Sequence, residues 1–500
     1  MRHARTGSCP CESGSAWRSE SVDQIQCPKY RRTVVSSARL LVMLLVALCL
    51  GPAVAHEPRN TLVTPGEHRY RASADPDRVI LVADQHPWRS QTVNWRTNHA
   101  VTEAVAQITE AHDTPGLHLT ARTVTGTVRP RTTENGLAHH HSVTFDDLRP
   151  DTLYAYRVRG QGTWSEWFQF RTAKRGFAPF TFFYFGDAQN SVRSHFSRVI
   201  REAFMEHTRP ALMLHAGDLV NLRAGIHDDE WGEWFAAGGF LHAMVPSIPV
   251  TGNHEFVNEE DEAGHRTRVL SHLWEAQFTV PGNGPPGLRD TVYFVEYQGV
   301  LFVALDSTRA LEDESLAVLQ AQWLEQLLRE NTHRWVIVSH HHPMQSVSLG
   351  RDNPMLREHW QPLYQRYGVD LVLQGHDHTY GRGANVPEGS TLVDNEVGTV
   401  YVVSVAGPKM YLVSAEARQD MTRVGEEVQL YQVIGVEEDR LRFESRTVSG
   451  QLYDAFDIRR LPDGRNTLID KMPAGLLERL CTNPAQPRPT RCWEGTELVD

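Results

Sequence analysis

The chain has 500 residues, of which 40% are apolar and 22% carry a charge. This length exceeds what one hydrophobic core organises, and this composition excludes a disordered or fibrous protein, so we expect a globular protein with two domains. The formal net charge of -11 argues against nucleic acid or an anionic membrane surface as a partner. An anionic substrate would therefore depend on local positive charge, which metal ions could supply.

Residues 1–55 have the features of a secretory signal peptide. Arg39 precedes the apolar run 40–50, and the small residues 53–55 (Ala-Val-Ala) form a cleavage site. The apolar run is shorter than the roughly 18 residues that a membrane-spanning helix needs. We therefore expect cleavage, export to the periplasm or the extracellular space, and no stable membrane anchor in the mature chain. The pair Arg31-Arg32 leaves twin-arginine export open beside the general secretory route, and the length of the segment leaves the start codon open.

Residues 60–173 predict an all-β sandwich. Short runs with alternating apolar and polar positions are separated by turn residues, which is typical of two packed antiparallel sheets. The stretch 148–158, together with 168–172, resembles fibronectin type III-like domains, and this resemblance implies seven strands and no chemistry. The histidines 139–141 lead into one of the strands, where we expect a solvated edge. The runs that predict strands are 78–82, 91–95, 141–145 and 154–158.

From residue 179 to about residue 460, apolar strand-like runs alternate with helical spacing. This alternation is the pattern of βαβ units and predicts an α/β domain after a linker at 173–178. The expected strands are 181–185, 211–215, 247–250, 300–305, 335–338, 370–373 and 400–405. The expected helices are 192–207, 230–240, 314–330 and 355–367, and a closing antiparallel pair is expected at 429–436 and 440–448.

The C-terminal tail, residues 461–500, is rich in proline and charged residues beyond Asp463, so we expect it to be poorly ordered. Cys481 and Cys492 are the two cysteines that remain after removal of the signal segment. In an oxidising compartment we expect them to form a disulfide. Two free thiols or a metal-binding pair are the alternatives, but no neighbouring His or Cys would complete a metal site.

Five clusters of metal-ligand residue types each follow an expected strand of the second domain. A single Gly-Asp or Gly-His-x-His is more often a turn, but five clusters in chain order, mixing Asp, Asn and His, favour a metal site. Ligands bind at the carboxyl ends of strands in an open α/β sheet, so we expect the clusters to converge. Their donors suit divalent or trivalent transition metals better than calcium or magnesium alone. The clusters are Gly186-Asp187-Ala188-Gln189, Gly217-Asp218-Leu219-Val220-Asn221, Gly252-Asn253-His254-Glu255, His340-His341-His342-Pro343 and Gly375-His376-Asp377-His378.

The order of these clusters is similar to that of the calcineurin-like metallophosphoesterases. With the fibronectin-like domain in front, the chain resembles the purple acid phosphatase branch of that superfamily, from about residue 60 to about residue 458. The resemblance implies a four-layer α/β/β/α sandwich after the all-β domain, and two metal ions drawn from Fe, Zn or Mn. It makes Asp218 the carboxylate that bridges them. It also makes Asp187 and His378 ligands of the first metal, and Asn253, His341 and His376 ligands of the second. His341 is preferred over its neighbours because it lies two residues before Pro343, as the family's ligand does.

His254 then lies outside the metal ligands and faces the phosphate. We expect it either to protonate the leaving alkoxide as a general acid or to stabilise the phosphate as a cation. Glu255 either orients His254 or forms a surface salt bridge. His340 and His342 are expected to support the ligands or the fold.

Two positions depart from the purple acid phosphatase pattern. Asn221 stands where the family has a tyrosinate ligand, so the protein should not be purple. Gln189 stands where many superfamily members have a histidine ligand. Either side chain could give an amide oxygen to the first metal, or water could fill the place. Loss of a charged oxygen ligand removes the strongest preference for ferric iron, so two divalent ions are an option.

The resulting expectation is an acid phosphatase-like hydrolase, in which a hydroxide bound by both metals attacks a small-molecule phosphomonoester without a covalent intermediate. The alternatives are a phosphodiesterase or nucleotide pyrophosphatase with the same site and, from another class, a non-catalytic binding or adhesion protein with a degenerate site. Tyr380 and Arg382 could line the substrate mouth, with Arg382 forking onto a phosphate oxygen. The loop 351–353 could contact the substrate or close a turn.

Overall fold

The computed structural model describes residues 60–221, 227–260, 266–385 and 395–481, with two short strands beyond them, β26 (Trp493–Glu494) and β27 (Glu497–Leu498). The expected signal segment 1–55 and Cys492 lie outside the described residues. Cys481 is disulfide-bonded. Across the described residues, every helix is too short or too polar to cross a bilayer.

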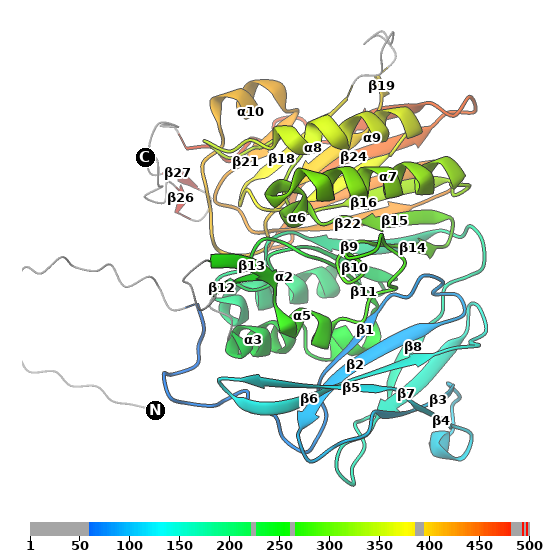
Figure 1. Ribbon diagram of the computed structural model, residues 1–500. Helices are drawn as coiled ribbons and strands as arrows, with labels where there is room; N and C mark the ends of the chain where they lie inside the picture. Colours follow the sequence, from blue (N-terminus) through cyan, green and yellow to red (C-terminus); the bar gives the residue numbers. More distant parts are fainter. Residues whose placement is uncertain are drawn as a thin grey trace, which may run out of the picture. The chain divides into compact units, whose positions relative to one another are not determined.

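The N-terminal part is a sandwich of two four-stranded layers (Figure 1). It has eight strands rather than the expected seven, because residues 122–133 change sheets at Gly126. A Cβ at Gly126 would lie 1.9 Å from the carbonyl oxygen of Ser142, so only glycine allows this crossing. One layer contains β1 (Asp77–Val82), β2 (Gln91–Asn98), β6 (Gly136–Phe145) and β5 (Thr127–Thr133). The other contains β4 (Arg122–Thr125), β3 (Val105–Glu110), β7 (Leu153–Val158) and β8 (Phe168–Arg171).

The expectation of a solvated edge at residues 139–141 is wrong. Strand β6 lies between β2 and β5, so it is not an edge strand of the sheet. His140 and His141 are buried, and the His141 ring stacks on Trp95 with 5.0 Å between centroids. His141 Nε2 is hydrogen-bonded to Thr97 Oγ1 at 2.7 Å. These histidines are therefore part of the sandwich core.

The sandwich continues into the first sheet of the α/β part. Strand β11 (Ser247–Val250) pairs in parallel with β1 through Val82 and Ser247, which gives a 12-stranded sheet. On its other side β11 adjoins β10 (Leu212–Ala216), which adjoins β9 (Phe180–Phe185). The sheet ends with β22 (Leu430–Val436), β23 (Arg440–Thr447), β24 (Leu452–Arg460), β25 (Asn466–Asp470) and β19 (Glu396–Val397).

A second sheet of seven strands packs against the first. Its order is β14 (Tyr293–Tyr297), β15 (Val300–Ala304), β16 (Trp335–Ser339), β17 (Leu371–Gln374), β20 (Val400–Val403), β18 (Tyr380–Ala384) and β21 (Arg423–Gly425). The antiparallel hairpin β12 (Phe256–Glu260) and β13 (Arg266–Leu270) lies outside both sheets.

Side-chain alternation along the strands shows the four layers. Phe182 and Tyr184 of β9 lie in the apolar core between the two sheets, whereas Phe183 and Phe185 pack against helices on the outer face. The first sheet is covered by α2 (Val192–Glu206) and α3 (Asp228–Gly238), with α4 (Phe240–Met244) and α5 (His272–Gln277) beside them. The second is covered by α6 (Ser307–Glu312), α7 (Glu314–Glu330), α8 (Pro354–His359) and α9 (Gln361–Tyr367) (Figure 1). The arrangement is the expected α/β/β/α sandwich.

Two further expectations are corrected. The expected helix 355–367 is broken at Trp360, because Pro362 in the first turn of α9 has no N–H to continue a helical ladder. The tail is ordered to Cys481. Strand β25 pairs with β24, and a short helix, α10 (Ala415–Asp420), contacts Cys481 at the end of the described tail. Glu478 accepts a hydrogen bond from the Val424 N–H at 2.8 Å.

Candidate metal centre

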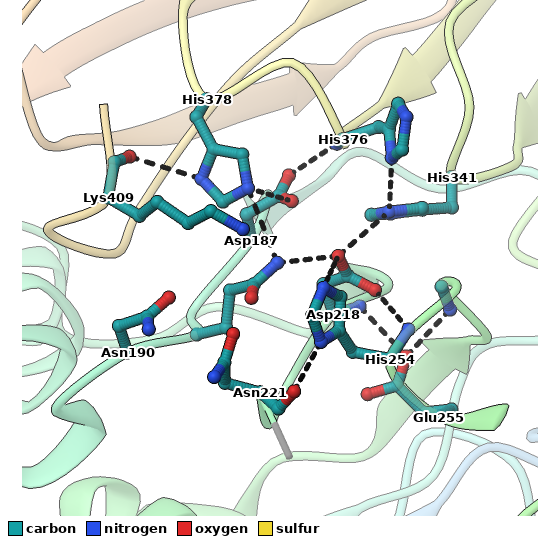
Figure 2. Close-up of polar contacts among 12 residues, drawn as sticks. Asp187, Asn190, Asp218, Asn221, His254, Glu255, His341, His376, His378 and Lys409 are labelled. Carbon is teal, nitrogen blue, oxygen red and sulfur yellow. Dashed lines mark hydrogen bonds and ion pairs between the residues drawn. The ribbon is translucent and has the colours of Figure 1, made fainter. Parts of the chain in front are cut away.

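The ligand clusters of the two sheets converge at one edge of the molecule. Strands β9, β10 and β11 run parallel, as do β15, β16 and β17, so their carboxyl ends bring the following residues together. Two groups have ligand atoms within 4.8 Å of one another, and Asp218 belongs to both. One group is Asp218, His341 and His376, and the other is Asp187, Asp218 and His378. Figure 2 shows Asp218 between the two.

Two of the glycines that precede ligand residues are required by close packing. A Cβ at Gly252 would lie 2.3 Å from Asp218 Oδ1, and one at Gly375 would lie 2.3 Å from Asp187 Oδ2. The ligand residues themselves have left-handed backbones, with φ of 52° at Asp218, 74° at His376 and 51° at His378. Non-glycine residues in this region are strained, and such strain persists where the surrounding structure holds it.

Two of the histidines are held by backbone carbonyl groups. His341 Nδ1 donates to the Ala216 carbonyl at 2.8 Å, and His378 Nδ1 donates to the Lys409 carbonyl at 3.1 Å. In each ring Nε2 then faces a carboxylate: His341 Nε2 is 3.2 Å from Asp218 Oδ2, and His378 Nε2 is 3.5 Å from Asp187 Oδ1. Because Nδ1 is held by a carbonyl, Nε2 is the nitrogen that can bind a metal ion once it carries no proton.

The ionisation of the site reflects burial and mutual attraction. Burial opposes the charge on Asp218, but the imidazoles of His341 and His254 hold its pKa well below its usual range. Burial also lowers the pKa of His341, but the carboxylates of Asp218 and Asp187 outweigh it and raise that pKa to about 9. Burial keeps the pKa values of His376 and His378 well below the usual range, so both rings are neutral.

Three buried oxygen atoms fit a cation. Asp187 Oδ1, Asn253 Oδ1 and Gln189 Oε1 have no hydrogen-bond partner within the described part of the chain. A buried polar atom left unpaired costs about 1–3 kcal/mol, and metal coordination would satisfy it. Across the site His376 Nδ1 also lies 3.3 Å from His341 Nε2, so two imidazole nitrogens face one another. These donors therefore fit two metal ions that share Asp218.

Gln189 contributes its side chain to the candidate metal site, whereas Asn221 contributes its backbone. Gln189 is fully buried inside the site, where its Nε2 donates to Asp218 Oδ2 at 2.5 Å and lies 3.3 Å from His378 Nε2. Its amide can present either atom to the site. Asn221 acts through its backbone: its carbonyl accepts a hydrogen bond from His254 Nδ1, and its N–H donates to Glu230 at 2.6 Å.

His254 lies at the mouth, with 13% of its side chain exposed and Nε2 3.8 Å from Asp218 Oδ2. Its backbone N–H donates to Asp218 Oδ1 at 2.8 Å. We expected Glu255 either to orient His254 or to form a surface salt bridge. It does neither, because it is fully buried beneath the ligand turns. It accepts hydrogen bonds from the N–H groups of Asp218, Leu219 and Gly252 at 2.8, 2.8 and 2.7 Å.

The expectation that Tyr380 and Arg382 line the substrate mouth is wrong. Both side chains point between the sheets, where the Tyr380 hydroxyl donates to Asp454 at 2.6 Å and Arg382 binds the same carboxylate at 2.7 and 3.1 Å. Arg351 stays near the site, but it pairs with Asp377 at 3.3 Å. The neighbours of His341 lie beside the ligands: His342 is held by Ser307, and His340 packs on Trp360.

Lys409 and Tyr411 are site residues that sequence reasoning missed. They follow β20, and the Tyr411 ring lies 5.0 Å from that of His378. The sequence does contain a pattern that indicates this segment, because Gly407 follows an apolar strand as the glycines of the recognised clusters do. Lysine is not a ligand type for these metals, and Tyr411 lies outside the five clusters, so a search for ligand clusters passed over both.

Comparison with known proteins agrees with the fold. Residues 76–172 match the profile of the purple acid phosphatase N-terminal domain, and residues 180–380 match that of the calcineurin-like phosphoesterases. An uncharacterized protein of Mycobacterium tuberculosis is 29% identical over 323 residues, which cover 55% of this chain and 58% of that protein. The Fe(3+)-Zn(2+) purple acid phosphatase 12 of Arabidopsis thaliana is 27% identical over 271 residues, 50% of this chain and 53% of its own.

A purple acid phosphatase from yellow lupin seeds has the same fold, with a TM-score of 0.64 at 18% identity, over 78% of this chain and 75% of its own. The two matches give the chain a calcineurin-like phosphoesterase domain preceded by a purple acid phosphatase N-terminal domain. In this order of domains and in sequence the chain is similar to the purple acid phosphatases. The chain spans a little over half the length of the curated relatives described here.

Proposed function

We propose that this protein is a metal-dependent phosphomonoesterase. The observation that carries the proposal is the pair of ligand groups that share Asp218. Asp187 and His378 would hold the first metal, with the Gln189 amide oxygen as a further donor, and His341, His376 and Asn253 would hold the second. Two metals bound there would lower the pKa of a shared water to near neutrality and offset charge that develops on the phosphoryl oxygens. Fe, Zn and Mn all accept this set of donors.

We further propose that His254 handles the proton of the reaction. Its Nδ1 donates to the Asn221 carbonyl, so the proton for a leaving group would come from Nε2, which lies 3.8 Å from Asp218 Oδ2 (Figure 2). In the imidazolium form Nε2 can donate a proton to the oxygen of a leaving alkoxide. The backbone N–H of the same residue donates to Asp218 Oδ1, so the turn that carries the acid is tied directly to the proposed bridging carboxylate.

We also propose that the protein is exported. The signal-like segment 1–55 supports this, and the disulfide at Cys481 is of a kind that persists in oxidising compartments. The substrate would then be a phosphate ester outside the cytoplasm.

The test is a parallel assay of 4-nitrophenyl phosphate and bis(4-nitrophenyl) phosphate before and after removal of metal by a chelator. We expect the monoester to be the better substrate, with activity lost on removal and regained when Zn, Mn or Fe is restored. A clear preference for the diester would establish a phosphodiesterase instead. Absence of hydrolysis of either ester by metal-loaded protein would support a non-catalytic binding protein.

A further inference from the structure

The segment 407–411, which follows β20, is fixed against the first-metal residues at three points. The Gly407 N–H donates to the Asp187 carbonyl at 2.6 Å, the Lys409 carbonyl accepts from His378 Nδ1 at 3.1 Å, and the Tyr411 N–H donates to the His378 carbonyl at 3.2 Å. A Cβ at Gly407 would lie 2.3 Å from the Gln189 carbonyl oxygen, so this close approach needs glycine. The segment therefore places Lys409 beside the site with a well-defined backbone.

The Lys409 side chain extends toward Asp187 and His378 (Figure 2). It is half-buried, and its Nζ lies 5.5 Å from the centre of the Tyr411 ring. Arg351 lies over the same ring at 4.8 Å, but its charge is balanced by Asp377. Among the residues that the structure describes, none forms an ion pair with the Lys409 ammonium.

The net charge of the site indicates which class of phosphate ester Lys409 can favour. Two divalent ions would bring four positive charges, of which Asp187, Asp218 and one hydroxide from the shared water would balance three, and Lys409 adds a second positive charge to the one that is left. A cation beside a cationic centre is unfavourable until an anion enters. A fully ionised phosphomonoester brings two negative charges, whereas a phosphodiester brings one. The additional positive charge therefore matches the additional negative charge of the monoester.

We propose that Lys409 is a specificity-determining residue whose ammonium binds the additional unesterified oxygen of a phosphomonoester, which a diester lacks, and so favours phosphomonoester dianions over diesters. The proposal rests on the proposed phosphoesterase function and names the substrate class of that site. A lysine ammonium suits this task, because it is a compact charge on a flexible stem and offers three donors to one oxygen.

The test compares Lys409→Met, which keeps the aliphatic stem on Tyr411, with Lys409→Arg, which keeps the charge. The matched control is Lys174→Met, because Lys174 precedes β9 whereas the site follows it, and 54% of its side chain is exposed. For Lys409→Met we expect kcat/KM for 4-nitrophenyl phosphate to fall roughly 10- to 100-fold, the loss typical of one hydrogen bond between charged groups. For bis(4-nitrophenyl) phosphate we expect a change within about threefold, because only one phosphoryl charge is present. Lys409→Arg should recover part of the loss, and Lys174→Met should resemble the wild type.

Titration calorimetry of the metal-loaded proteins gives a readout that does not depend on turnover. We expect Lys409→Met to bind inorganic phosphate more weakly by a similar factor, to bind dimethyl phosphate as the wild type does, and to retain the wild-type metal content. Equal losses for both esters, an unchanged monoester rate, or loss of metal would overturn the proposal. If the wild type hydrolysed neither ester, the proposed function would fail, while the phosphate titration would still decide the role of Lys409.

Discussion

Glu255→Gln tests how the two ligand turns are held. The carboxylate of Glu255 is fully buried and accepts three backbone N–H groups: Oε2 binds those of Asp218 and Gly252, and Oε1 binds that of Leu219. A glutamine amide can keep its oxygen on the first two, but its NH₂ group then faces the Leu219 N–H. The variant loses one hydrogen bond and leaves a buried donor unpaired. The unpaired donor costs about 1–3 kcal/mol.

The turn that carries Asp218 is the one that loosens, so metal binding should weaken as well as stability. Loss of a group that orients metal ligands typically costs roughly 10- to 100-fold in metal affinity. The assay is metal content by mass spectrometry after dialysis against graded chelator, together with thermal unfolding of the metal-free protein. We expect a lower unfolding temperature and metal loss at a lower chelator concentration.

Asp370→Asn is the matched control. Asp370 is also buried and accepts the Val336 N–H at 2.9 Å, but it precedes β17, whereas the ligands follow that strand. This variant should lose stability and keep the wild-type chelator profile. A Glu255→Gln protein whose metal retention equals that of the wild type would refute the role given to Glu255.

Two further predictions concern His254 and His242. For His254→Ala we expect unchanged metal content, since the backbone N–H that holds Asp218 remains, and turnover slower by roughly 10²- to 10⁴-fold; loss of metal would show that His254 is a ligand. Burial lowers the pKa of His242 to about 4, so the stability that its neutral form provides is present above the unfolded value near 6.5 and falls as pH drops toward 4. At pH 5 this linkage amounts to about 2 kcal/mol. In His242→Phe, urea unfolding should therefore depend less on pH between 7 and 5, and an unchanged dependence would contradict the assignment.

The fold and the convergence of the ligand clusters could be predicted, because both depend on patterns that a sequence shows directly. Strand periodicity and a ligand type immediately after each strand place Asp187, Asp218 and His376 at the carboxyl ends of parallel strands, the first two in one sheet and His376 in the other. The mixture of Asp, Asn and His donors then indicates the class of metal. Neither step needs knowledge of long-range side-chain contacts.

The surroundings of the ligands could not be predicted, because they depend on which face of an element is buried. Tyr380 and Arg382 share one face of β18, and only the packing of the two sheets shows that this face meets Asp454 rather than substrate. Glu255 resembles a surface residue until the turns close over it. Lys409 escaped notice because its role does not require a metal-ligand type.

The same limit applies to the C-terminal tail. Its proline and charged residues suggested disorder, but β25 finds a partner in β24 and Arg423 donates to the carbonyls of Leu476 and Leu477 at 2.9 and 3.0 Å. Amino-acid composition does not predict backbone pairing of this kind.

Metal stoichiometry of the wild type and Asp218→Asn is the most direct test of the shared carboxylate. Both proteins would be loaded with Zn or Mn, freed of excess ion by gel filtration, and measured by inductively coupled plasma mass spectrometry. We predict two ions per chain in the wild type and a loss of both in Asp218→Asn, because Asp218 belongs to both ligand groups. Two ions retained by Asp218→Asn, or none bound by the wild type, would contradict the account.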